Sequence, residues 1–346
     1  MTRIFPLVFL LISLYVSPAL SQSGSEEASN TTASKQAEFD IWLDELREEA
    51  LSIGISQDII GTALKDLKPI ARIIERDRTQ SEFTINLEKY RNRVITQANI
   101  STGIAKRELH SELLKKVSEK YQVQPRFILA IWGIETRFGA VKPTVPVIPA
   151  VATLAFDRRR SSYFRQQVFA TLKMLQQNYI DLPSLKGSWA GAMGQPQFMP
   201  SSYLTYAQDF NGDGRRDIWN DEGDVFASIA NYLAQHGWRF DQTWGREVQV
   251  PLHIAKAASD DLDQKSRGCR AMKKMSHVKK LSEWTKAGVT KIDGSPLPTR
   301  DLKAAMIFPD GVDGSAYLVY DNYRSILRYN CAHLYAVTVG ELADKL

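Results

Sequence analysis

The sequence predicts an α+β protein in which helices predominate. Apolar residues recur at helical spacing from Phe39 to Tyr121 and again near the C-terminal end. Between these regions lies a segment, Phe127 to Phe138, that is apolar on every side, as in a helix buried at the centre of a core. Short runs typical of strands occur only between Glu247 and Tyr320.

The first residues have the features of a secretory signal. Met1-Thr2-Arg3 is a short basic start, and the apolar run that follows, Ile4 to Val16, is too short to span a bilayer comfortably. We expect cleavage after Ser21, at small residues, which leaves 346 − 21 = 325 residues. An uncleaved anchor is the alternative. No Cys follows the apolar run, so no lipid-attachment site is expected.

The composition divides the rest of the chain into five parts. Residues 22–36 are rich in Ser, Thr, Glu and Ala and predict a flexible linker. The other parts are a helical domain over 37–121, a core over 122–245, a small β-containing region over 246–322 and a C-terminal helix over 323–346. In the helical domain, Ser56 should cap a short helix that ends near Leu67.

The β-containing region is predicted from three short segments. Val248, Val250 and Leu252 alternate with polar residues, while Ala304–Phe308 and Tyr317–Tyr320 are apolar runs bounded by Gly and Asp. Both patterns are typical of strands, and they set this region apart from the helical remainder.

The net charge of +5 indicates an anionic partner, such as a wall polymer or a membrane surface, and export makes nucleic acid an unsuitable one. Residues 265–280 contain seven Lys or Arg and no acid, which favours a solvated basic loop, with a patch for the anionic partner as the alternative. The two cysteines, Cys269 and Cys331, can pair in an oxidising compartment if the fold brings them together. Such a bridge would be worth about 4 kcal/mol in the chain-entropy model.

Glu135 is an isolated carboxylate in the apolar segment. Pro125 suits the first turn of its helix, and Gly139 suits the end. Burial and the negative end of the helix both raise the pKa of such a carboxyl group. A carboxylic acid that stays protonated near neutral pH can act as the general acid in cleavage of a glycosidic bond. The alternative is a Glu that reaches solvent at the helix end.

Residues 187–203 form a loop of small residues, which lets the backbone approach a ligand closely. Ser188 and Gln197 supply polar groups, and aromatic residues supply flat apolar faces. Sugar rings need both kinds of contact. The alternative is a structural loop that packs against the core.

Residues 209–220 follow the pattern of a calcium-binding loop, with oxygen side chains at the first, third and fifth positions and Gly at the sixth. Asn220 occupies the twelfth position, where Glu is usual, and Asp224 could supply the missing carboxylate. The expected ligands are Asp209, Asn211, Asp213, the carbonyl of Arg215 and Asp224. A metal-free turn is the alternative for the loop, and an N-cap for a helix over 225–236 is the alternative for Asp224.

Other enzyme classes lack their motifs here. The five histidines are scattered and no HExxH occurs, and phosphate-binding loops, dinucleotide fingerprints and GxSxG elbows are also missing from the sequence. We therefore expect no catalytic cofactor. Three adjacent arginines, Arg158 to Arg160, can bind an anionic group or form a solvated surface.

Taken together, five segments resemble the membrane-bound lytic transglycosylase B family. They are residues 133–139, 187–203, 209–219, 228–232 with 236–238, and 328–330, in the family's order. The resemblance runs from about Ala37 to the C-terminus. It implies a lysozyme-like helical core with a flanking helical domain and a small β-containing domain. It also implies cleavage of peptidoglycan between N-acetylmuramic acid and N-acetylglucosamine without water, which leaves a 1,6-anhydromuramoyl end.

The resemblance assigns roles to individual residues. Glu135 matches the catalytic acid/base, and Asp209, Asn211, Asp213, Arg215 and Asp224 match ligands of a structural Ca²⁺. The residues that match substrate contacts are Ser188, Gln197, Tyr232, Tyr329, Asn330, Arg159, Arg160 and Tyr335. Two segments depart from the family. Gln195-Pro196 replaces an aromatic residue and Gly, and Asn220 replaces Asp.

The absence of a lipid-attachment site suggests a soluble periplasmic member of this family, despite the family's name, and we expect a monomer that acts on peptidoglycan glycan strands. By hypothesis, Glu135 protonates the leaving oxygen and then accepts the proton of the muramoyl 6-hydroxyl, with help from the 2-acetamido group of the substrate. A hydrolytic muramidase on the same core and a non-catalytic wall-binding protein are the alternatives.

Overall fold

The computed structural model describes residues 23–79, 85–264 and 269–346, with the backbone alone for residues 23–33. The predicted signal, residues 1–21, lies outside the described residues. Within the described ranges, no helix combines the length and the apolar character that a membrane crossing requires.

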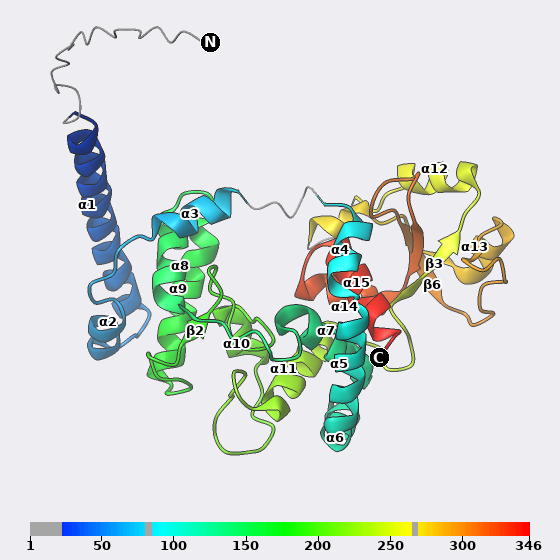
Figure 1. The fold of residues 1–346 in the computed structure, drawn as a ribbon, viewed down its shortest axis with the longest axis horizontal. Coiled ribbons are helices and arrows are strands. Elements are labelled where there is room, and N and C mark those ends of the chain that lie inside the picture. The colour runs from blue at the N-terminus through cyan, green and yellow to red at the C-terminus, as the bar shows by residue number, and fades with distance from the viewer. Residues whose placement is uncertain (1–22, 80–84, 265–268) are drawn as a thin grey trace, which may run out of the picture.

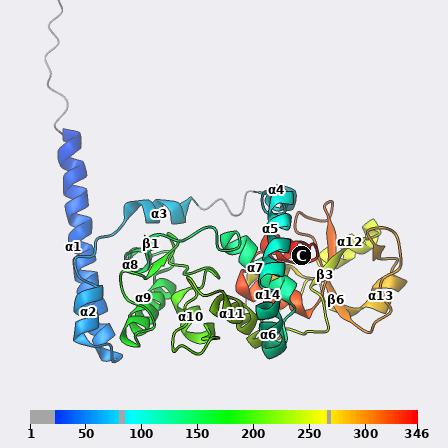
Figure 2. The same cartoon turned by 60° about the horizontal axis from the view of Figure 1, so that its bottom comes forward.

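Three N-terminal helices pack at one end of the molecule. They are α1 (Ser23–Ser52), α2 (Gln57–Ala63) and α3 (Ala71–Arg78), and they lie beside α8 (Val147–Phe156) and α9 (Ser161–Gln176) in both views (Figures 1 and 2). Ser56 caps α2 as predicted, because its Oγ accepts the N–H of Ile59 at 3.4 Å. The segment predicted as a flexible linker differs, since residues from Ser23 onward belong to α1. The Ala, Glu, Lys and Gln residues of this segment favour a helix. The segment therefore lengthens, at its N-terminal side, the amphipathic helix that contains Phe39.

The next helices build the centre of the molecule. They are α4 (Leu87–Val94), α5 (Gln97–Leu109), α6 (Ser111–Tyr121), α7 (Pro125–Thr136) and α11 (Glu222–Gln235). Residues 37–121, which the sequence groups as one helical domain, therefore contribute to two hydrophobic cores. Helices α1 to α3 share a core with α8 and α9, whereas α4 to α6 share one with α7 and α11. The domain boundaries themselves stay a prediction.

The β-containing region holds a five-stranded antiparallel sheet of order β4-β6-β7-β3-β5. Its strands are β3 (Gly245–Gln249), β4 (Lys279–Lys280), β5 (Thr290–Lys291), β6 (Lys303–Ile307) and β7 (Ala316–Val319). Two predicted strands are confirmed as β6 and β7. The alternation at Val248 to Leu252 is strand only up to Gln249, because Pro251 precedes helix α12 (Leu252–Asp260).

Both faces of this sheet are buried, which explains the continuous apolar runs. On one face, Ala305 and Val319 pack against the central helices. On the other, Met306 and Leu318 pack with Trp284 of α13 (Leu281–Lys286). The sheet with α12 and α13 lies at the opposite end of the molecule from α1 (Figure 1).

The C-terminal stretch, predicted as a single helix over 323–346, is two helices, α14 (Asp321–Tyr329) and α15 (His333–Ala343). Cys331 lies in the break between them and is joined to Cys269 by a disulfide with a Cα–Cα distance of 5.4 Å. The backbone is extended at Asn330 and Ala332 on either side of this break, and the disulfide ties the break to the short 3₁₀ helix Arg270–Lys274.

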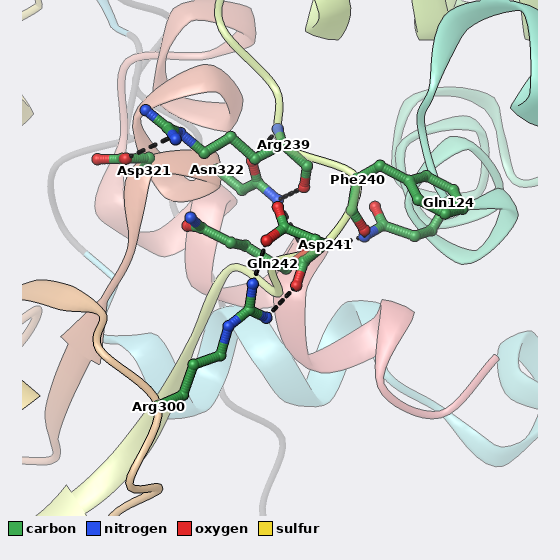
Figure 3. Close-up of polar contacts among 8 residues, drawn as sticks. All are labelled: Gln124, Arg239, Phe240, Asp241, Gln242, Arg300, Asp321 and Asn322. Atoms are coloured by element: carbon green, nitrogen blue, oxygen red, sulfur yellow. Dashed lines mark hydrogen bonds and ion pairs between the residues drawn. The ribbon is translucent and has the colours of Figure 1, made fainter.

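Polar contacts anchor the connection between α11 and β3 to its neighbours (Figure 3). The Gln124 amide, just before α7, donates to the carbonyl of Gln242 at 2.9 Å. Asn322 in α14 accepts the N–H of Arg239 at 2.7 Å and donates to its carbonyl at 2.9 Å. Two helices of the central core therefore fix the path of the chain into the sheet.

A charged pair adds a contact from the β-containing region to the same connection. Arg300, in the loop before β6, forms a salt bridge with Asp241 and donates to its backbone carbonyl (Figure 3). Arg239 lies 3.2 Å from Asp321 of α14. These groups are largely exposed, so they orient the β-containing region more than they stabilise it.

The small elements of the core surround a loop of Gly and Pro. They are the strand pair β1 (Val145–Pro146) and β2 (Lys186–Gly187), and helix α10 (Pro200–Tyr206). Residues 187–203 continue directly from β2 into α10, so regular elements fix both ends of this loop.

Candidate active site

Helix α7 presents Glu135 in its last turn. The helix begins at Pro125 as predicted, but it ends at Thr136, before Gly139. Arg137 and Phe138 both adopt positive φ, +51° and +57°, a conformation that costs non-glycine residues energy. Phe138 is held there because its ring folds back over Gly133, where an added Cβ would lie 2.6 Å from the ring.

The carboxyl group of Glu135 is partly buried and has a specific partner. Burial raises the pKa of Glu135 to about 7, which is the larger influence. The Tyr335 hydroxyl donates a hydrogen bond to Oε1 at 2.7 Å, which lowers that pKa, because it favours the ionised form. A Glu with a pKa near 7 can lose and regain a proton at neutral pH.

Aromatic rings extend from this pair. Tyr335 stacks at 6.4 Å on Tyr329, which lies 4.8 Å from Tyr232 and 5.8 Å from Phe198 between ring centroids. Burial raises the pKa of Tyr335 and of Tyr329 well above the usual value, so both stay protonated donors. Tyr329 packs against both hydrophobic cores, so the site lies where the two cores meet.

The hydroxyl groups of two of these rings are bonded to the backbone. Tyr329 donates to the carbonyl of Pro196 and Tyr232 donates to the carbonyl of Arg328, each at 2.6 Å. These bonds fix the rings, and the ring faces are then the parts suited to contact a sugar. Asn330, the next residue, is exposed beside them.

Ser188 and Gln197 bond within the small-residue loop. The hydroxyl of Ser188 accepts the N–H of Ala192 at 3.1 Å, and the amide of Gln197 donates to the carbonyl of Gly194 at 2.8 Å. Gln197 has a φ of +53°, a second strained position near the site. The loop therefore forms internal turns, over residues 188–192 and 194–197, and is not simply extended.

Gln195 departs from the family pattern in the sequence, and in the structure it is a central contact of the loop. Its buried side chain accepts the indole N–H of Trp132 at 2.6 Å and donates to the carbonyl of Trp219 at 3.0 Å. Its backbone carbonyl accepts the hydroxyl of Thr136 at 3.0 Å. Gln195 thereby connects the end of α7, next to Glu135, with the loop over 209–220. In the sequence, the sign of this role was a polar amide side chain, Gln195, within a loop of small residues.

Arg159 and Arg160, the predicted arginine pair, share one partner. Arg159 Nε donates to Asp77 Oδ2 at 2.7 Å, and Arg160 forms a salt bridge with the other oxygen. Asp77 belongs to α3 and is almost fully buried, so the pair ties α3 to the start of α9. Both arginines stay partly exposed, 48% and 39% by side chain, and can still face an anion.

The loop over 209–220 is built on carboxylate-to-backbone bonds. Asp209 accepts the N–H groups of Gly212 and Gly214, at 2.7 and 2.8 Å. Asp224 is buried and accepts from Phe210 and Asp217, both at 2.7 Å. Asp224 is not the N-cap of α11, because Asp221 caps that helix by accepting the N–H of Asp224.

The donor set of this loop suits calcium, since it consists of oxygens alone. Burial is the main cause that raises the pKa of Asp224 to about 6; the hydrogen bonds from Phe210 and Asp217 oppose this rise, and the charges of Asp221 and Asp209 contribute to it. A bound cation would relieve the repulsion among these carboxylates. Among the described residues, however, no three acidic, His or Cys side chains already converge as a metal cluster. The carboxylates are turned towards backbone N–H groups instead.

Comparison with known proteins gives this arrangement a context. Residues 38–344 match the family described as Transglycosylase SLT domain. The chain belongs to this family. It is 33% identical over 258 residues to the membrane-bound lytic murein transglycosylase B of Escherichia coli K12, an alignment that covers 74% of this chain but only 66% of that protein.

Solved structures show the same fold. SltB3 of Pseudomonas aeruginosa, crystallised with NAG-anhNAM-pentapeptide, has a TM-score of 0.80 and 38% identity, over 88% of this chain and 78% of that one. The Escherichia coli lytic transglycosylase Slt35, crystallised with calcium, has a TM-score of 0.71 and 28% identity, over 88% and 91%. The predicted family and the predominantly helical, lysozyme-like fold class are confirmed.

Proposed function

We propose that this protein is a peptidoglycan lytic transglycosylase that cleaves the bond between N-acetylmuramic acid and N-acetylglucosamine without water. The observation that carries the proposal is the raised pKa of Glu135, about 7, in a chain that belongs to the transglycosylase family. The complex of its relative SltB3 with an anhydromuramoyl peptide supports the same product class.

In the first step, protonated Glu135 gives its proton to the glycosidic oxygen, and the bond from that oxygen to the anomeric carbon breaks. The N-acetylglucosamine portion leaves with a hydroxyl group. The 2-acetamido oxygen of the muramoyl residue can stabilise the electron-poor anomeric carbon, so this chemistry needs no second protein carboxylate. The Tyr335 hydroxyl then stabilises the Glu135 anion through the 2.7 Å hydrogen bond.

In the second step, the Glu135 anion accepts the proton of the muramoyl 6-hydroxyl as that oxygen bonds to the anomeric carbon. The product is the 1,6-anhydro ring, and Glu135 is protonated again. A pKa near the working pH suits both steps, because the same group must donate a proton and then regain one. Tyr329, which is half-buried, supplies a ring face near this centre, and the buried rings of Phe198 and Tyr232 pack against it.

The test is mass spectrometry of the products released from purified sacculi. Products lighter by one water than reducing muropeptides support the transglycosylase, and reducing ends would instead mean a hydrolytic muramidase. Glu135→Gln should abolish turnover but retain binding to sacculi. Glu119→Gln is the matched control, because Glu119 is an exposed Glu at the end of α6. Turnover by Glu135→Gln near the wild-type rate would refute the assignment.

We also propose that residues 209–224 bind a structural Ca²⁺, with Asp209, Asn211, Asp213, the Arg215 carbonyl and Asp224 as ligands. The oxygen-only donor set supports this, as does the calcium complex of the relative Slt35. The ion would neutralise the carboxylates and take no part in bond cleavage. Calcium should raise the melting temperature of the wild type and leave that of Asp209→Ala unchanged.

We propose, finally, that the chain is exported to the periplasm by a cleaved signal over residues 1–21. The basic start, the apolar run and the small residues near Ser21 support this, and so does a substrate that lies outside the cytoplasm. N-terminal sequencing of the protein recovered from cells tests it. A chain that still starts at Met1 would contradict it.

A further inference from the structure

Two adjoining cavities lie next to the active site, on the side of the calcium-type loop. One measures about 560 Å³ and the other about 450 Å³. Four residues line both of them, namely Lys142, Gln195, Trp219 and Asn220, so the two form one continuous depression. Gln195 also bonds to Trp132 and Thr136 of α7, so this double cavity adjoins the helix that carries Glu135.

Positive charge predominates in the double cavity. Its lining includes five cationic and three acidic side chains; the cations are Lys106, Arg137, Lys142, Lys186 and Arg215. Two of the acids, Asp181 and Asp217, already accept backbone N–H groups, at 2.8 Å from Ser184 and 3.0 Å from Trp219. The third acid, Glu222, lies at the start of α11.

Few carboxylates of the protein neutralise these cations. Across the described parts of the chain, no carboxylate lies within salt-bridge distance of Arg137, Lys142 or Lys186. Lys142 and Arg137 are exposed. Elsewhere in the fold, arginines such as Arg159 and Arg165 do pair with carboxylates. Cations without partners that converge from separate segments are suited to bind an anionic ligand.

The lining also has the polar and aromatic groups of a saccharide site. Trp219, which lines both cavities, is half-buried, and its indole N–H donates to the carbonyl of Lys186 at 2.9 Å, which fixes the ring. Tyr179 adds a second aromatic side chain, and Asn178 and Asn220 add exposed amides. Flat rings with amides and cations fit a ligand that combines sugars with carboxylates.

We propose that this double cavity is an accessory site for the carboxylate-bearing peptide stems of the glycan strand. The proposal rests on the proposed function, because it takes peptidoglycan as the substrate. Stems that project from the strand next to the cleaved bond would place carboxylates against Lys142 and Lys186, with Trp219 against the neighbouring sugar. The site would hold the strand while Glu135 acts on it, without contacting the reacting atoms.

The test reverses two charges in the full chain. Lys142→Glu/Lys186→Glu is compared with Lys116→Glu/Lys173→Glu, an equal charge change at positions outside both cavities; Lys116 and Lys173 are exposed lysines on α6 and α9. All proteins carry Glu135→Gln, so that binding is measured without cleavage. The ligands are soluble glycan strands with their peptide stems and the same strands after enzymatic removal of the stems.

The cavity variant should bind the peptide-bearing strands on the order of tenfold more weakly than the control variant, and added salt should reduce the difference. Both variants should bind the peptide-free strands equally. Equal binding of the peptide-bearing strands would overturn the proposal. An equal loss on peptide-free strands would also overturn it, because the cavity would then bind sugar rather than peptide.

The cleavage assay keeps this result separate from the proposed function. Wild-type protein that releases no anhydromuramoyl products would refute the transglycosylase, whatever the two variants bind. Wild-type protein that releases them, together with a cavity variant that binds like the control, would refute the accessory site alone. Melting temperatures of both double variants confirm that each is folded.

Discussion

Replacing Tyr335 by Phe should shift the pH dependence of the reaction upwards. The hydroxyl of Tyr335 donates to Glu135 Oε1 at 2.7 Å and lowers the pKa of that carboxyl group by favouring the ionised form. Loss of this bond leaves burial unopposed, so the pKa must rise above about 7. The ring of Phe keeps the stacking on Tyr329.

The size of the effect follows from the charge on the acceptor. A hydrogen bond to a charged group contributes about 1.5–3 kcal/mol, and one pKa unit corresponds to about 1.4 kcal/mol, so the shift should be about 1–2 units. The same loss destabilises the Glu135 anion between the two steps, so kcat should fall by roughly tenfold to a hundredfold. In the proposed mechanism, activity requires protonated Glu135 at the start, so the alkaline limb of the pH profile reports the pKa of Glu135.

The assay is the release of anhydromuropeptides as a function of pH, with kcat/KM followed across the alkaline limb. Tyr329→Phe is the control, because its hydroxyl donates to the Pro196 carbonyl and not to Glu135. That variant should keep the limb of the wild type. An alkaline limb that stays in place or moves down in Tyr335→Phe would refute the assigned role of the bond.

Three further predictions concern stability. The pKa of Glu135 is raised from 4.5 to about 7 by folding, so the folded state binds more protons than the unfolded state between these values, and stability should fall as pH rises through this window. The free energy of unfolding should fall by at most about 3 kcal/mol, and by less because solvent partly reaches the group. Urea titrations at several pH values should show this fall in the wild type and not in Glu135→Gln. Gln195→Met leaves the Trp132 indole and the Trp219 carbonyl without their partner. The free energy of unfolding should fall by about 2–3 kcal/mol, and kcat should also fall. A variant with wild-type stability would contradict the two bonds. Cys269→Ser/Cys331→Ser removes a disulfide that spans 62 residues and should lower the free energy of unfolding by about 4 kcal/mol. A reducing agent should lower it by the same amount in the wild type and leave the double variant unchanged.

The local features of the site were predictable because neighbouring residues carry them. The apolar surroundings of Glu135, the helix start at Pro125 and the cap at Ser56 depend on residues within a few positions, and the structure has all three. The strands β6 and β7 followed from short apolar runs for the same reason. The predicted roles of the site residues in substrate binding stay predictions.

Local patterns failed at two helix ends. Helix α7 stops before Gly139, where Arg137 and Phe138 adopt positive φ and the Phe138 ring lies over Gly133. The C-terminal segment breaks into two helices at Cys331, which is joined to Cys269 across 62 residues. Helix periodicity reports neither the side-chain packing at the first end nor the long-range link at the second.

The sequence by itself determined the family, the helical character and the isolated carboxylate in an apolar helix. Each of these features depends on neighbouring residues or on the order of motifs along the chain. Only the tertiary structure decided what surrounds that carboxylate. Tyr335 lies 200 residues from Glu135 along the chain, and Gln195 connects α7 to a loop that follows it by more than seventy residues. The pKa of Glu135 depends on burial and on that one bond, and both exist only once separate segments pack together.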